Sequence, residues 1–291
     1  MQGEKYSVTQ YPISAILGFI EAGEFVIPEI QRPFVWKRSQ VRDLIDSLYN
    51  GYPTGYLIIW KNPSVKTKDG GSSEGKKILI DGQQRVTALM ASISGKEVLD
   101  EDFNSGRIKI AFNPMEMEAS KQFAVQDASH LKDKKWISDI SVIFKPEFRN
   151  RAFEDAYILS NPEANVDAID DALTQLKSIA NRQIGVIELA HQLDIDEVTE
   201  IFIRINSQGK ALSQSDFAMS KIAADEKYGG NMLRKAVDYF CHLAVKPEFY
   251  PRIEKDSLFM ESEYAAKIKW LRNDKESIYD PDYGDMLRVS F

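Results

Sequence analysis

The chain has 291 residues, of which 43% are hydrophobic and 28% charged, so it can bury a sizeable core as one large domain or two ordinary ones. A net charge of −7 argues against nucleic-acid binding over the whole surface, and the single cysteine, Cys241, excludes an internal disulfide framework. The chain has neither an apolar run near the roughly 20 residues of a membrane span nor the features of a secretion signal. These features, with the one cysteine, predict a protein of the reducing cytoplasm without a membrane partner.

The first predicted elements are two helices with a short strand between them. Apolar residues spaced by three and four between positions 13 and 20 predict a helix, with Thr9 as its cap. Residues 25–27 predict a short strand. A second helix is predicted to begin with Ser39 as its cap and to end near Gly51.

A polar pentapeptide, Asp81-Gly-Gln-Gln-Arg85, lies where a predicted buried strand over 78–80 meets a predicted helix. At such a junction, unpaired backbone N–H groups and the positive end of the helix dipole favour an anion. Gly82 lets the backbone approach a phosphate closely, and Arg85 can donate two hydrogen bonds to it. An ordinary strand–turn–helix junction with a solvated Arg85 is an equally supported alternative.

Predicted strands and helices alternate up to about residue 112, and helices dominate after it. This order predicts an α+β fold with a small mixed sheet and a large helical portion. Strands are predicted over 56–60, 107–112 and 184–189, and helices over 138–144, 148–159, 166–180, 198–205, 232–245 and 261–271, with Ser213 as the cap of one more helix.

Two other polar segments carry candidate binding residues. Gln31 and Arg32 lie between two prolines directly after a predicted strand, and such stiffening would hold both side chains in place for a phosphate or a base. Arg204 and Asn206 lie before a predicted turn. Both segments also have purely structural explanations, a tight turn for the first and a helix end followed by a capped helix for the second.

A basic segment over residues 61–77 has five lysines against two acids, and such a patch can engage phosphates although it is more often a solvated face. Trp36, which follows the Gln31-Arg32 pair, could stack on a base. The candidate DNA contacts are therefore Trp36, Lys37, Lys66 and Lys68.

These polar segments, in this order along the chain, resemble the amino-terminal domain of the GmrSD-type modification-dependent restriction endonucleases. The matching stretches are residues 27–60, 78–91 and 202–217, and Asp81-Gly-Gln-Gln-Arg85 is the family's signature. The resemblance implies a ParB/sulfiredoxin-like domain over residues 1–225 with a helical insertion at about 130–182. Residues 226–291 would form a helical extension.

The family implies nucleoside triphosphate hydrolysis coupled to DNA restriction or phage defence. Asp81, Gln84 and Arg85 would be the catalytic residues, with Asp81 holding Mg²⁺ or orienting water, although a turn-forming aspartate explains Asp81 equally well. The implied nucleotide-binding residues are Gln31, Arg32, Gly82, Gln83, Gln84, Arg85, Thr87, Arg204 and Asn206.

Two motifs of related proteins are missing from this sequence, and their absence limits the activities expected of it. Sulfiredoxins carry a catalytic cysteine beside the corresponding arginine, but here that neighbour is Gln84, which argues against sulfinic acid reduction. No His-Asn-His nuclease pattern occurs, so DNA cleavage would fall to a separate nuclease domain or partner acting on modified DNA. The alternative is a sensor that binds nucleotide or a modified base without hydrolysis, and self-association stays open.

Overall fold

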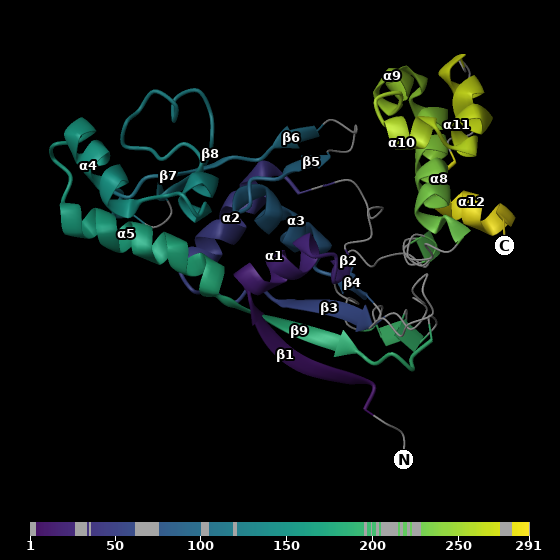
Figure 1. Cartoon of the computed structure of the whole chain (residues 1–291), viewed down its shortest axis with the longest axis horizontal. Helices are drawn as coiled ribbons and strands as arrows, with labels where there is room; N and C mark the ends of the chain where they lie inside the picture. Colours follow the sequence, from purple (N-terminus) through teal and green to yellow (C-terminus); the bar gives the residue numbers. More distant parts are fainter. Residues whose placement is uncertain are drawn as a thin grey trace.

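A five-stranded mixed sheet organises the chain before residue 190. Its strands are β1 (Tyr6–Pro12), β2 (Phe25–Val26), β3 (Tyr56–Lys61), β4 (Lys77–Asp81) and β9 (Gln183–Leu189), in the spatial order β1-β9-β3-β4-β2 (Figure 1). The β1–β9 and β3–β4 pairs are antiparallel, whereas the β3–β9 and β2–β4 pairs are parallel.

The structure is a computed structural model that describes most residues of the chain. These residues are 4–26, 34, 36–61, 76–99, 105–118, 121–194, 197–198, 200–201, 204, 215, 218–219, 222, 228–273 and 281–290.

Both faces of the sheet are apolar in its centre. On β3, Leu57 and Ile59 face the main core, while Ile58 and Trp60 belong to a second, smaller core on the opposite face. Such a continuous apolar run is expected where a strand is buried on both sides. Three helices cover the main-core face (Figure 1): α1 (Ile13–Glu21), α2 (Arg38–Tyr49) and α3 (Gln83–Ser92).

Two predicted helix caps are wrong. Residues 6–12 form β1 and run directly into α1, so Thr9 lies within a strand and cannot cap the helix. The strand escaped prediction because its alternation of polar and apolar residues is weak. Helix α2 has Lys37 as its cap, two residues before the predicted cap at Ser39, and it ends at Tyr49, near the predicted stop.

The predicted strand over residues 107–112 is two short strands with different partners. Strand β6 (Ser105–Arg107) pairs with β5 (Glu97–Leu99), and β7 (Ile110–Phe112) pairs with β8 (Phe123–Val125), all antiparallel. The sequence indicated the extended conformation but could not show that the strand breaks, because its pairing partners lie outside the local pattern.

A helical segment separates this region from β9. It contains the 3₁₀ helices η2 (Ile140–Phe144) and η3 (Ile179–Asn181) and the helices α4 (Asn150–Ser160) and α5 (Val166–Ser178). The three helices predicted here are confirmed to within a few residues, and the predicted strand over 184–189 corresponds to β9. The limits of 130–182 for an insertion stay a prediction.

The carboxyl-terminal part is helical and has a core of its own, built from buried residues between Ala236 and Leu271. Its elements are α8 (Gly230–Val245), η5 (Pro247–Phe249), α9 (Tyr250–Ile253), α10 (Ser257–Met260), α11 (Glu263–Ile268), η6 (Lys269–Asn273) and α12 (Tyr283–Ser290). The helix predicted over 232–245 corresponds to α8, whereas the one predicted over 261–271 is the short helix α11 followed by the 3₁₀ helix η6. The domain boundary at 225 stays a prediction.

The α+β class predicted from the sequence is confirmed. Among the described residues, no helix is long and apolar enough to cross a membrane. The predicted cap at Ser213 and most of the lysine-rich segment lie outside the described residues.

Candidate functional site

The strand, turn and helix around the polar pentapeptide occur as predicted. Strand β4 ends at Asp81, α3 begins at Gln83, and Gly82 between them has a φ of 92°, in the left-handed region. A Cβ atom at Gly82 would lie 2.3 Å from Cδ2 of Leu57, so this position excludes any side chain as well as favouring glycine for its backbone conformation. The turn is therefore fixed by the packing of β3 against it.

The amino terminus of α3 has the features of an anion site. Its first helical hydrogen bond runs from the N–H of Val86 to the carbonyl of Gly82, 2.9 Å away. Helix geometry directs the N–H groups of the first turn out of the end of the helix, and Gly82 has no side chain to cap them. These donors and the positive end of the helix dipole point the same way, which favours a phosphate.

Arg85 is anchored beside this terminus rather than solvated. Its Nη1 donates a hydrogen bond to the carbonyl oxygen of Tyr56, 3.0 Å away, at the start of β3. The guanidinium also lies close to Gly55, where a Cβ would come within 3.3 Å of Nη2. Since a guanidinium has five N–H donors, the bond to Tyr56 uses only one of them.

Burial dominates the electrostatics of the Asp81–Arg85 pair. It raises the pKa of the Asp81 carboxyl above its usual range, and the Arg85 charge and the Gly82 N–H oppose that rise. Burial likewise lowers the pKa of the Arg85 guanidinium, which the Asp81 charge opposes. Charges in such a partly dehydrated site act more strongly on a ligand than they would in water.

Three more predicted site residues, Gln83, Gln84 and Thr87, lie in the first turns of α3. Gln83 is buried, and its Nε2 donates to the carbonyl oxygen of Leu79, 2.8 Å away on β4. This bond ties the helix to the strand, so the side-chain amide of Gln83 is already engaged. Gln84 and Thr87 are half-buried in the same helix.

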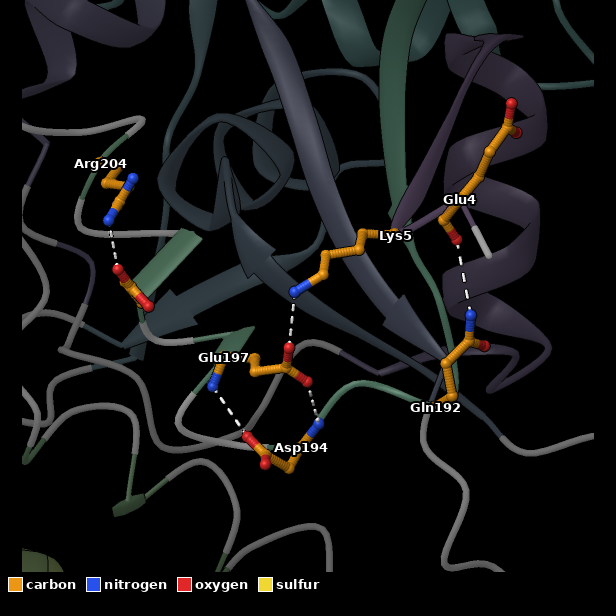
Figure 2. Close-up of polar contacts among 7 residues, drawn as sticks. Glu4, Lys5, Gln192, Asp194, Glu197 and Arg204 are labelled. Atoms are coloured by element: carbon orange, nitrogen blue, oxygen red, sulfur yellow. Dashed lines mark hydrogen bonds and ion pairs between the residues drawn. The ribbon is translucent and has the colours of Figure 1, made fainter. Parts of the chain in front are cut away.

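The remaining predicted residues that the structure describes lie on other elements. Trp36 is half-buried against the main core, and the N–H of Lys37 bonds to Oε1 of Gln40, 2.8 Å away, at the start of α2. Arg204, labelled in Figure 2, forms an ion pair with the carboxylate of Glu200. The proposed roles of these residues stay predictions, and Gln31, Arg32, Asn206, Lys66 and Lys68 lie outside the described residues.

Sequence reasoning missed the start of β3, with the glycine before it, as part of this site. Gly55, the backbone of Tyr56 and the side chain of Leu57 enclose Arg85 and Gly82 from the neighbouring strand. The only local signal was a glycine directly before a buried strand. The contact joins residues 29 positions apart, and nothing in either segment alone indicates it.

A preformed metal centre is not seen in the part of the chain that the structure describes, where no three histidine, cysteine or acidic side chains form a metal-binding group. Asp81 alone still fits Mg²⁺, since this ion is commonly held by one or two carboxylates together with the phosphates of its substrate.

Cys241, the single cysteine, is a buried residue of the carboxyl-terminal helices. It is buried in α8, and burial raises the pKa of its thiol to about 12, so the reactive thiolate is scarce at neutral pH.

Comparison with known families finds a match over most of the chain. A family model of the GmrSD restriction endonuclease N-terminal domain matches residues 13–223, a range that includes every candidate nucleotide-binding residue. No curated protein matches the chain significantly.

Proposed function

This chain belongs to the family of the GmrSD restriction endonuclease N-terminal domain, and we propose that it is the nucleotide-hydrolysing module of its restriction system. The proposed site is the β4–α3 turn. There the module would bind a nucleoside triphosphate and hydrolyse its β–γ bond in the presence of Mg²⁺.

One observation carries the proposal. Arg85 is anchored on β3 beside a helix terminus whose cap is a glycine that can accept no side chain. Its position is thus set before a ligand arrives, and a preorganised guanidinium loses less entropy on binding a phosphate.

Each residue has a role that follows from its position. The N–H groups of the first turn of α3 and the guanidinium of Arg85 would stabilise the charge that builds on the phosphate oxygens, which is the main catalytic contribution in phosphoryl transfer. Asp81 would hold Mg²⁺ or orient the attacking water. When bound, Mg²⁺ supplies further positive charge to the phosphates.

Hydrolysis at this turn would be coupled to cleavage of modified DNA by a separate nuclease domain or partner. The family supports a role in restriction. Because the 291 residues contain no His-Asn-His pattern, we assign cleavage to that other domain or partner.

The first test is nucleotide binding and phosphate release with Mg²⁺ by the wild type and Arg85→Ala. A lost hydrogen-bonded contact to a charged phosphate costs about 1.5–3 kcal/mol, so the affinity should fall roughly ten- to a hundredfold. The matched control is Arg182→Ala. Arg182 also donates to a backbone carbonyl before β3, that of Tyr49, 3.3 Å away, and it also packs on a glycine, Gly51.

Loss of binding and turnover in Arg85→Ala, with Arg182→Ala unaffected, supports the hydrolase. Tight binding by the wild type without phosphate release would instead favour the sensor. Equal loss in both variants would mean that the effect comes from the fold, and the proposal would fail.

A further inference from the structure

Strand β1 forms one edge of the five-stranded sheet, and no strand of the described chain lies beyond it (Figure 1). Its register with β9 is unbroken over seven residue pairs, from Tyr6–Leu189 to Pro12–Gln183. The backbone groups on its outer side can therefore be assigned one by one.

The odd-numbered residues of β1 bond to β9. The N–H of Ala190 bonds to the carbonyl of Lys5, and the N–H of Ile13 to the carbonyl of Arg182, both at 3.0 Å. Because bonded and non-bonded pairs alternate along an antiparallel ladder, the even-numbered residues point their N–H and C=O groups away from β9. Tyr6, Val8 and Gln10 thus present donors and acceptors outward.

Both ends of this outward row are closed. At one end, the Nε2 of Gln192 donates to the carbonyl oxygen of Glu4, 3.5 Å away, and the side chain of the adjacent Lys5 forms an ion pair with Glu197, 2.7 Å away. Both contacts are drawn in Figure 2. At the other end Pro12, also at an even-numbered position, has no N–H to offer. The open stretch therefore runs from Tyr6 to Gln10.

This stretch lacks the usual protection of an edge strand. Native edges carry charges, prolines or bulges that prevent pairing with another chain, and residues 6–11 contain no charge, no proline and no break in register. Tyr6 and Val8 are 56% and 57% exposed on the same face of the sheet. Strands with such edges are templates for pairing.

We propose that β1 pairs with β1 of a second copy of this chain, antiparallel about a two-fold axis at Val8. In this register Val8 faces Val8 of the copy, and Tyr6 faces Gln10 in both directions. Each of these pairs exchanges two backbone hydrogen bonds, because all three residues present both groups outward. The interface is self-complementary, as a two-fold contact must be.

A second copy of the chain can pair in this register because no two like charges would lie opposite each other. Lys5, the cation nearest the open stretch, would face the uncharged Tyr11 of the copy, and it is neutralised by Glu197 within its own chain. On the exposed face, Tyr6 of the copy would lie beside Gln10, whose neighbour on β9 is Gly185, and the ring of Tyr56 already lies against Gly185. The pairing would extend this aromatic surface across the joined sheets.

The expected association is weak and depends on salt. Edge pairing alone buries little area, and small interfaces are transient. Each copy also carries a net charge of −7, so added salt should favour the dimer by screening the repulsion between copies.

The register is tested with Val8→Cys and a thiol-specific cross-linker of about 8 Å span. Cβ atoms of directly opposed residues are about 5 Å apart, so Val8→Cys should cross-link to itself. The matched control is Gln10→Cys, on the same face of the same strand, whose two copies would be roughly 14 Å apart. Gln10→Cys should cross-link only when mixed with Tyr6→Cys. The native Cys241 is buried.

Dimerisation is tested by sedimentation velocity from about 1 to 100 µM. The wild type should shift toward the dimer with concentration, and Val8→Pro and Val8→Lys should stay monomeric with little change in melting temperature, because the N–H of Val8 points away from β9 and edge strands tolerate both residues. Nucleotide binding should persist in both variants, since Asp81 lies three strands away from β1.

A wild type that stays monomeric at 100 µM would overturn the proposal. So would a dimer that survives Val8→Pro and Val8→Lys, or equal self-cross-linking by Val8→Cys and Gln10→Cys, because each would place the interface elsewhere. These readouts do not involve nucleotide, so the dimer and the proposed hydrolase can fail independently.

Discussion

At the scale of the residue, Gly82 and Arg85 depend on the same neighbouring strand. Leu57 closes the space in which a Gly82 side chain would lie, and the carbonyl of Tyr56 holds the Arg85 guanidinium. The start of β3 is thus a wall of the proposed phosphate site, and changes there should affect function even though these residues carry no reacting group.

We predict that Gly82→Ala destabilises the protein by at least about 1–2 kcal/mol, the cost of a left-handed alanine, with the clash against Leu57 adding to it. The control is Gly18→Ala in α1, where a Cβ would meet nothing within 4 Å. That change should stabilise by about 0.5–1 kcal/mol, because glycine weakens a helix interior. Urea unfolding measures both. Equal effects of the two substitutions would contradict the assigned backbone conformation.

We predict that Asp81→Asn leaves the protein as stable as the wild type or more stable at neutral pH. Burial raises the pKa of Asp81 in the folded state, so its contribution to stability is present below its unfolded pKa of about 4 and is lost as the pH rises through the raised folded value. The advantage of Asp81→Asn should therefore shrink as the pH falls toward 4. If Asp81 holds Mg²⁺, phosphate release should also be lost.

The control for this pH dependence is Asp127→Ala, for which the opposite sign is expected. Hydrogen bonds from Ser129 and His130 lower the pKa of Asp127 to about 2, so its carboxylate stabilises the fold at neutral pH. Thermal unfolding across the pH range measures both variants. A lower melting temperature for Asp81→Asn at pH 7 would show that the favourable effects of the Arg85 charge and the Gly82 N–H outweigh burial.

At the scale of the element, α3 is connected to β4 by a side-chain hydrogen bond as well as by the backbone of the turn. The amide of Gln83 bonds to the carbonyl of Leu79 at the beginning of the helix, and the Oγ of Ser92 bonds to the carbonyl of Ala88 at its end. Both bonds are buried, but only the first lies at the turn. Substitutions at these two positions can therefore distinguish an effect on the stability of α3 from an effect on its position relative to β4.

We predict that Gln83→Met and Ser92→Ala each lower the free energy of unfolding by about 1 kcal/mol, the net value of one hydrogen bond. Only Gln83→Met should also weaken nucleotide binding, because it releases the end of the helix that would meet the phosphates. Calorimetric titration with nucleotide measures the difference. Unchanged affinity in Gln83→Met would show that the tie to Leu79 does not position the site.

Some helices and strands of this protein could be predicted from the local sequence, and others could not. The strand–turn–helix unit over 77–92 was predictable because an apolar run, a glycine and a helical spacing follow one another within it. Strand β1 was not, because its partner β9 is more than 170 residues away and no neighbouring segment indicates the pairing. The break between β6 and β7 is likewise set by distant partners.

At the scale of the whole molecule, the described residues form a large core in the sheet region and a separate core in the carboxyl-terminal helices. Leu89 belongs to the first and Leu243 to the second, and both are fully buried. The helices from α8 onward can thus bury apolar surface among themselves.

We predict two thermal transitions in calorimetry, one for each core. Leu89→Ala and Leu243→Ala should each cost about 2–5 kcal/mol, and each should lower only the transition of its own core. Each variant is the control for the other. A single transition lowered by both would mean that the two cores unfold as one unit and would contradict the domain boundary predicted at 225.

The sequence by itself determined the family, the α+β class and the position of the candidate site, because these rest on contiguous signals: a polar pentapeptide, apolar periodicities and turn residues. Only the tertiary structure decided what surrounds that site. The anchoring of Arg85 on Tyr56, the exclusion of a side chain at Gly82 by Leu57, and the open edge of β1 are contacts between strands that are distant in sequence. Hydrogen bonds and packing across a sheet depend on strand order and register, which no local pattern contains.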